Sequence, residues 1–291
     1  MIKTKARLFI YGIFAITAFC VFLYLLFPSQ MVSALIVSRI AGINPQVQVS
    51  LNDTRPSVLP PGFKFEPLSV AYADIPVMHM PYFKVMPAIF SFIGDQKEFT
   101  FNGPLGAGTL KGHAAVSLQG PKPQTKVTMN LTEVPIDVIE ILQQWPNYKL
   151  LGEMTAYIDY DSRKGAGGTA NVKMDVTPTR IVFNPPIVGL EQMEFSQLTA
   201  EMTVTPRMLQ IKRCELSGSQ LEGKVTGAIV FREPAQNSRI TLSCTLKPQP
   251  AFMAEHKNDM LATFLGSETA QKRGVIIRIS GTLGNPSYVI R

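Results

Sequence analysis

Residues 8–27 read LFIYGIFAITAFCVFLYLLF, a run of 20 residues without a charged side chain. A helix rises about 1.5 Å per residue, so such a run crosses a hydrocarbon layer of about 30 Å. Three basic residues stand within the first seven positions, and the first acidic residue is Asp53. The positive-inside rule then places the N-terminus in the cytoplasm. We predict a transmembrane helix from Leu8 to Phe27, preceded by a basic cytoplasmic tail over residues 1–7.

A cleaved signal peptide is the alternative, since Val32-Ser33-Ala34 resembles a small-residue cleavage site. The apolar run is longer than the roughly 7 to 15 residues of a signal-peptide core, and Pro28 follows it directly. We therefore expect the segment to be retained, with the remaining chain outside the cytoplasm.

Residues 28–45 form a juxtamembrane helix and linker in this interpretation. Ser29 can cap a new helix, and Gly42 is the residue type expected just past a helix end. The segment is largely apolar, so the helix lies along the membrane or closes one end of the following domain. An ordinary core helix explains the same pattern.

The hydrophobic period changes from helical to alternating after residue 46. Val127, Met129 and Leu131, for example, alternate with polar residues. Such alternation is typical of antiparallel strands with one buried and one wet face. Similar runs are Val47–Leu51, Phe99–Phe101, Val172–Val176, Ala200–Val204 and Val275–Ile279. The sequence predicts a mainly β domain over residues 46–291, a curved antiparallel sheet with a few short helices.

Two helices interrupt the predicted strands, at Pro135 to Trp145 and at Ala251 to Leu265. Each follows a pair of strands opened by a similar motif, Gly-Thr-Leu-Lys-Gly at 108–112 and Ser-Gln-Leu-Glu-Gly at 219–223. Recurrence at a fixed spacing indicates an internal repeat. The repeat units cover about 97–160 and 208–291.

Few residues point to catalysis or metal binding. His79, His113 and His256 are isolated from one another and from cysteines. The carboxylate pairs Asp159 with Asp161 and Glu191 with Glu194 fit a solvated strand face. We predict no catalytic residue, no metal site and no cofactor.

The basic residues do not form a nucleic-acid surface. The net charge is +7, but Lys and Arg are scattered along the chain. Arg207, Lys212 and Arg213 could contact anionic lipid headgroups, although a solvated face is the simpler interpretation. We predict no nucleic-acid partner.

Cys214 and Cys244 are the only cysteines after the apolar run. An oxidising compartment would permit a disulfide between them, but the sequence does not give the distance between their Cα atoms. A disulfide and two free thiols both remain possible.

The alternating strands supply a large apolar surface that includes many of the 17 phenylalanines and 13 methionines. If the sheet curls without a second layer, this surface lines an apolar groove. If other elements cover it, the same residues form a core. Alternation fits both arrangements, and we expect the filled core.

Several features occur in a characteristic order: the apolar run ending in Phe27-Pro28, the segment RPSVLPPGFKFEPL at 55–68, and the glycine-flanked strand openings. This order resembles the type II secretion system protein N (GspN) family. The closing segment ISGTLGNPSY at 279–288 also resembles the last strands of AsmA-like proteins.

These resemblances imply an inner-membrane protein of a diderm bacterium with a periplasmic β-rich domain. The GspN likeness implies a non-enzymatic component of a type II secretion system that contacts other secretion components. The AsmA likeness implies instead a lipid-binding or lipid-transfer protein with an apolar groove and membrane lipid as its partner. Neither likeness supplies catalytic residues.

Overall fold

The computed structural model describes residues 11–290 except 13, 16, 20, 23, 25, 44–45, 58–59, 73–74, 120–122, 144–147, 166, 188–189 and 256–272. The chain divides into two units, Met1–Pro87 and Ala88–Arg291. The β-rich domain over residues 46–291, with its possible repeat units, stays a prediction. Each unit is described separately below.

The described residues between positions 11 and 24 are helical. The first unit further contains α2 (Ser29–Ile43), β1 (Val47–Ser57), β2 (Gly62–Tyr72), β3 (Ile75–Met80) and β4 (Phe83–Pro87). Strand β2 pairs antiparallel with β1, and also with β3 and β4. Helix α2 packs on β1, where the buried hydroxyls of Ser33 and Thr54 lie 2.6 Å apart. The helix expected after Pro28 is therefore present and contacts the sheet.

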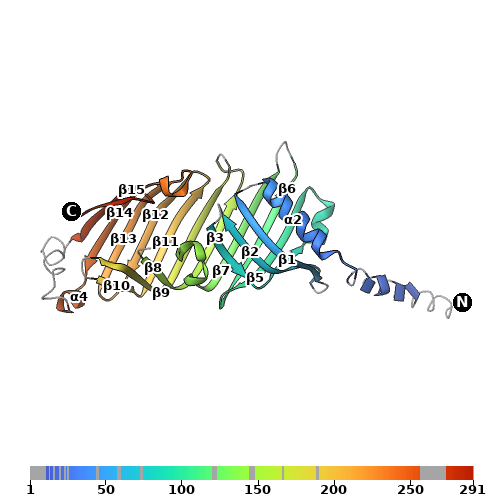
Figure 1. Ribbon diagram of the computed structural model, residues 1–291, viewed down its shortest axis with the longest axis horizontal. Coiled ribbons are helices and arrows are strands. Elements are labelled where there is room, and N and C mark those ends of the chain that lie inside the picture. The colour runs from blue at the N-terminus through green and yellow to red at the C-terminus, as the bar shows by residue number, and fades with distance from the viewer. Residues whose placement is uncertain are drawn as a thin grey trace. The chain divides into compact units, whose positions relative to one another are not determined.

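The second unit is an antiparallel sheet of twelve strands among its described residues (Figure 1). The strands are β5 (Gln96–Leu105), β6 (Gly108–Ser117), β7 (Gln124–Pro135), β8 (Tyr148–Asp161), β9 (Thr169–Ile187), β10 (Leu190–Phe195), β11 (Gln197–Thr205), β12 (Met208–Ser217), β13 (Leu221–Val230), β14 (Arg239–Pro248), β15 (Val275–Thr282) and β16 (Pro286–Ile290). They pair in chain order from β5 to β16, except that β10 pairs only with β9 and β11 takes its place in the path. The predicted antiparallel, mainly β fold is confirmed.

Short helical turns join some of these strands. They are η1 (Ile89–Ile93), η2 (Ile136–Val138), α3 (Glu140–Gln143), η3 (Ala235–Asn237) and α4 (Pro250–Glu255). The helix predicted from Pro135 to Trp145 is wrong in extent, because Pro135 still pairs within β7 and Ile139 has φ −90° and ψ 87°. The second predicted helix begins one residue early, at Pro250, and most of its length lies outside the described residues.

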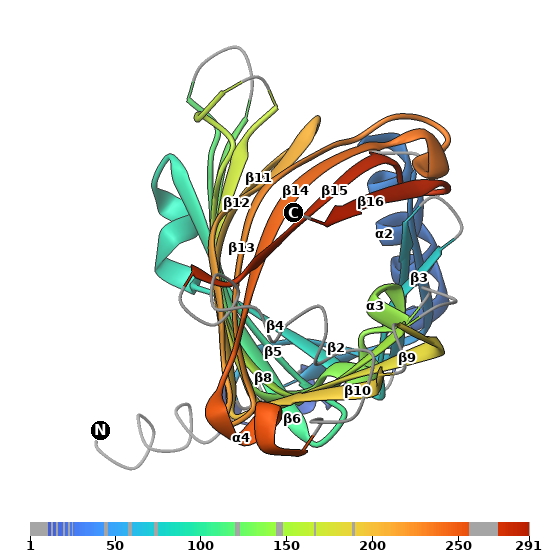
Figure 2. The ribbon, with the colours of Figure 1, turned by 90° about the vertical axis from the view of Figure 1, so that its left-hand side faces the viewer.

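The hairpin, helix and strand order of the predicted repeat recurs in the second unit. Strands β6 and β7 are followed by η2, α3 and β8, whereas β13 and β14 are followed by α4 and β15. Figure 2 shows that the strands of this unit bend around the side on which α3 lies.

The structure leaves the predicted transmembrane helix without direct support. Leu8 lies outside the described residues, while the ring of Phe27 lies 6.0 Å from that of Phe63. Within the part of the chain that the structure describes, no helix combines the length and hydropathy that a bilayer crossing requires.

Candidate functional site: the apolar face of the second unit

The strand register of the second unit aligns apolar side chains into rows. Paired residues of antiparallel strands point to the same side of the sheet, so a row crosses from strand to strand on one face. The Leu110 row continues through Leu131, Ala156, Met174, Ala200, Cys214, Val225, Cys244 and Ile277. We call the side of the sheet that carries this row the apolar face.

Two further rows lie beside it on the apolar face. The Phe101 row contains Gly112, Met129, Ile158, Val172, Met202, Ile211, Gly227, Leu242, Ile279 and Tyr288. The Phe99 row contains Ala114, Val127, Tyr160, Ala170, Val204, Leu209, Ile229 and Ile240. The Phe101 row spans eleven strands, which at about 4.8 Å per strand is about 48 Å.

The opposite face is polar. Between the Phe101 and Phe99 rows, on the other side of the same strands, stand Thr100, His113, Thr128, Asp159, Asn171, Thr203 and Gln210. The sheet is therefore amphipathic across its whole width.

Burial differs between the rows. Leu110, Leu131, Ala156 and Ala200 of the Leu110 row are at most 6% exposed, while its other five residues are half-buried. In the Phe101 row every residue is only half-buried, apart from Tyr288, which is 60% exposed. The described residues thus cover part of one margin of the apolar face and leave its centre half-buried.

The covered margin is closed by short elements. The residues that fill it are Ile136 of η2, Phe195 of β10 and Phe252 of α4, each at most 3% exposed. Strand β8 contacts η2 and α3, and β10 contacts β13. No second sheet packs on the apolar face within the described residues, so the filled core expected from the sequence forms only along this margin.

The apolar face lies on the inside of the curve. Burial raises the pKa of Tyr148 at the start of β8, and nearby Tyr288 of the Phe101 row raises it further. Strands β8 and β16 are seven positions apart in the sheet, about 34 Å along a flat surface. Tyr288 can affect Tyr148 only if the two side chains are much closer than 34 Å. The sheet must therefore curl toward its apolar side, as Figure 2 shows.

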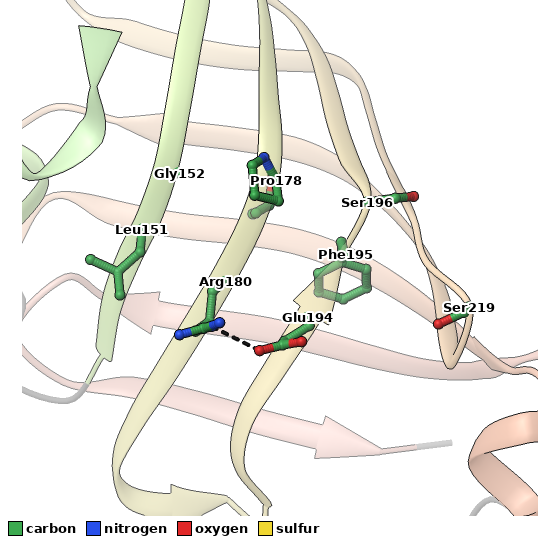
Figure 3. A pocket seen from close by; sticks show the side chains of 9 residues that line it. Leu151, Gly152, Pro178, Arg180, Glu194, Phe195, Ser196 and Ser219 are labelled. Carbon is green, nitrogen blue, oxygen red and sulfur yellow. Dashed lines mark ion pairs between the residues drawn. The ribbon is translucent and has the colours of Figure 1, made fainter. Parts of the chain in front are cut away.

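A separate pocket of about 490 Å³ lies where β8, β9 and β10 bend (Figure 3). It is lined by Leu151, Gly152, Pro178, Thr179, Arg180, Glu194, Phe195, Ser196 and Ser219. Gly152 has φ +145° at the register shift between β8 and β9, and a Cβ there would stand 2.3 Å from the carbonyl oxygen of Pro178. Arg180 Nε lies 2.8 Å from Glu194 Oε1. Its charge is thus already compensated, which makes the pocket a weak anion site.

The two cysteines both lie in the Leu110 row and are free. Each is opposite Val225 of the intervening strand β13, so two strand spacings of about 4.8 Å separate them. A disulfide needs Cα atoms closer than about 7 Å. The possible Cys214–Cys244 disulfide therefore does not form in this structure. Burial raises the pKa of each thiol to about 11.

His79 and His113 each have a polar neighbour within their own unit. His79 Nδ1 lies 2.8 Å from the hydroxyl of Ser69, and His113 Nε2 lies 3.6 Å from Glu98 Oε2. His256 lies outside the described residues. Among the residues that were placed, no three acidic, histidine or cysteine side chains gather into a metal site.

The acidic pairs do not converge on a reaction centre. Asp161 is 3% exposed and accepts hydrogen bonds from the Arg163 guanidinium, so its assignment to a solvated face is wrong. Asp159 faces Thr128 and Asn171 on the polar side. Glu191 is exposed, and Glu194 pairs with Arg180.

The three basic residues considered for lipid headgroups are exposed but do not form one cluster. Arg207 lies in the turn after β11, and Lys212 lies at the register shift of β12. Arg213 Nη2 pairs with Glu215 Oε2 at 2.5 Å.

Sequence reasoning missed two features of the second unit. The first is β10, whose pairing with the bent second half of β9 has no local signal in the sequence. The second is the turn η1, a short apolar run between Pro87 and Gly94 that looks like a buried segment but is exposed. Comparison of the chain with family models, with curated proteins and with solved structures finds no match.

Proposed function

We propose that the protein binds lipid, with acyl chains lying along the Phe101 row of the apolar face. The observation that carries this proposal is that the row crosses eleven strands while its side chains remain half-buried. Hydrocarbon on these side chains would remove the remaining apolar surface from water, which contributes about 25 cal/mol per Å². The AsmA-like closing segment supports the same function.

The chemistry of the row suits flexible hydrocarbon. Met129 and Met202 are unbranched and adaptable, and the row has no charged side chain. Lipid headgroups would stay at the Phe99 row, on the side away from the covered margin, where water remains available. In this proposal residues 8–27 anchor the protein in the bacterial inner membrane, and the chain after Phe27 is periplasmic.

The test is native mass spectrometry of the full chain released from its own membranes in mild detergent. We expect bound phospholipid in the unmodified protein and its loss in Met202→Glu, because Met202 faces Val172 and Ile211 near the middle of the row. Thr203→Glu is the matched control, since it places the same charge one residue away on the polar face.

A variant without added charge distinguishes loss of lipid because the Phe101 row is blocked from loss of lipid because the protein misfolds. Met202→Trp fills the row with apolar volume and should also reduce bound lipid, while circular dichroism still reports the native strand content. Phospholipid bound equally to all these variants, or absent from the unmodified chain, would reject the proposal.

A second candidate is the non-enzymatic type II secretion component that the GspN likeness implies. The observation that favours it is the edge of β16, which pairs only with β15 among the described strands. Tyr288 and Val289 of this edge are 60% and 49% exposed. Open strand edges accept partner strands through main-chain hydrogen bonds.

Photo-crosslinking tests this candidate in the native host. A benzoyl-phenylalanine at Tyr288 should yield an adduct with another secretion component, whereas the same group at Tyr157 on the polar face should not. Adducts at neither position, or equally at both, would remove the β16 edge as the contact surface.

A further inference from the structure

Four strongly exposed apolar side chains among the described residues of the second unit gather at η1. Phe90 and Ile93 are each 89% exposed, Ile89 is 60% exposed, and Leu118 at the end of β6 is 58% exposed. The Leu118 amide donates to the Asp95 carbonyl at 3.2 Å, which fixes this side chain beside η1. We call these four residues the apolar tip. Large apolar side chains with this exposure commonly mark an interaction site.

The tip is a formed turn in which several backbone groups are hydrogen-bonded. The Ser91 amide donates to the Ala88 carbonyl at 2.9 Å, and the Gly94 amide donates to the Ser91 carbonyl at 3.2 Å. The Ala88 amide donates to the Glu98 carbonyl of β5, and the Ser91 hydroxyl accepts from the Glu98 amide. These bonds hold the turn against β5, so it can enter a less polar layer with these groups satisfied.

Charged groups stand at the base of the tip and not on it. Residues 88–94 carry no charged side chain. Lys97 Nζ donates to the Gly94 carbonyl at 2.7 Å, and the Asp95 carboxylate accepts from the Gln119 amide at 2.7 Å. An apolar projection with a cation at its base fits the layered polarity of a bilayer surface.

From this geometry we infer that the apolar tip inserts into the interfacial layer of the lipid bilayer that holds the protein. A protein partner generally requires a surface of about 800 Å² on each side, which a single turn does not offer. Interfacial insertion needs only a few apolar side chains. The inference rests on the proposed lipid-binding function, since Phe99 begins its row directly after Glu98 and the tip would bring that end of the apolar face to its lipid source.

Tryptophan fluorescence in proteoliposomes tests the insertion. The chain has one tryptophan, so Trp145→Phe gives a background in which Phe90→Trp reports on the tip alone. Proteoliposomes of the full chain are prepared with ordinary and with brominated phosphatidylcholine. We expect the Phe90→Trp emission to shift to the blue and to lose intensity with brominated lipid. Tyr157→Trp in the same background is the control and should show neither change.

The outcomes distinguish membrane insertion of the tip from lipid binding by the apolar face. If brominated lipid fails to quench Phe90→Trp, or if the tip becomes shielded only when a soluble protein fraction is added, the insertion is rejected. Phospholipid bound to the same preparations is measured by native mass spectrometry. If phospholipid is bound but Phe90→Trp is not quenched, only the insertion of the tip is rejected. If no phospholipid is bound to the unmodified chain, the lipid-binding function itself is rejected.

Discussion

Tyr148 on β8 and Tyr288 on β16 lie near enough for an ionised Tyr288 to add to the rise that burial causes in the pKa of Tyr148, although seven strand positions separate them in the sheet. Tyr288 belongs to the Phe101 row, and Tyr148 begins the strand whose later residues carry Ile158 of the same row. The two tyrosines therefore show that the second unit closes around its apolar side. This curvature turns an amphipathic sheet into a candidate binding surface.

The two thiols of the apolar face should be free and slow to alkylate. Because burial raises the pKa of Cys214 and Cys244 to about 11, the thiolate fraction at neutral pH is small. We expect the alkylation rate of a Cys20→Ser chain to rise about tenfold per pH unit from pH 7 to pH 10. Mass spectrometry under non-reducing conditions measures both properties. A bridged Cys214–Cys244 peptide would contradict the separation across β13.

Gly112 should not tolerate a side chain. A Cβ at this position would stand 2.3 Å from Phe101 Cζ and 2.5 Å from the Thr128 carbonyl oxygen. Gly112→Ala should therefore lower the free energy of unfolding by about 1–3 kcal/mol, as overpacking does. Urea unfolding of the full chain in detergent measures this change. Lys111→Ala, at an exposed neighbouring position, should leave the urea midpoint unchanged.

The buried hydroxyl pair of the first unit gives a double-mutant test. Thr54→Val leaves the Ser33 hydroxyl without its partner, which should cost about 1–3 kcal/mol. Adding Ser33→Ala removes the unpaired group and should recover part of that stability. Protection of the first unit from limited proteolysis measures the effect. Additive losses in the double variant would show that the two hydroxyls do not depend on each other.

The Asp161–Arg163 pair should contribute to stability at neutral pH and lose that contribution in acid. Hydrogen bonds from the Arg163 side chain and amide hold the pKa of Asp161 below its usual value of about 3.9. A depressed pKa in the folded state stabilises the protein above about pH 4, and the effect fades as pH falls further. In Asp161→Asn the urea midpoint should depend less on pH between pH 5 and pH 3 than in the unmodified protein. Glu194→Gln, in an exposed ion pair, should change this profile little.

Local sequence patterns predicted the strands well because alternation is read within a few residues. Val127, Met129 and Leu131 form consecutive positions of the apolar face, as their spacing indicates. The helix expected after Pro135 was too long because the spacing of Ile136, Ile139 and Leu142 fits a helix, although Ile136 is instead buried in a short turn.

The site itself depends on pairing between distant parts of the chain. Whether the apolar residues form a filled core or an open face is decided by which elements cover them, and no local pattern encodes that. Likewise, the distance between Cys214 and Cys244 follows from the position of β13 between their strands. The exposure of Phe90 depends on which other elements pack on η1, and the composition of the turn does not indicate this.

The hairpins β6–β7 and β13–β14 each contribute two members to every apolar row. Copying one such hairpin would lengthen all three rows by about 10 Å without altering their chemistry. In the proposed lipid-binding function, the length of hydrocarbon that the face can hold would therefore follow from strand number, so that duplication of a short gene segment would change it.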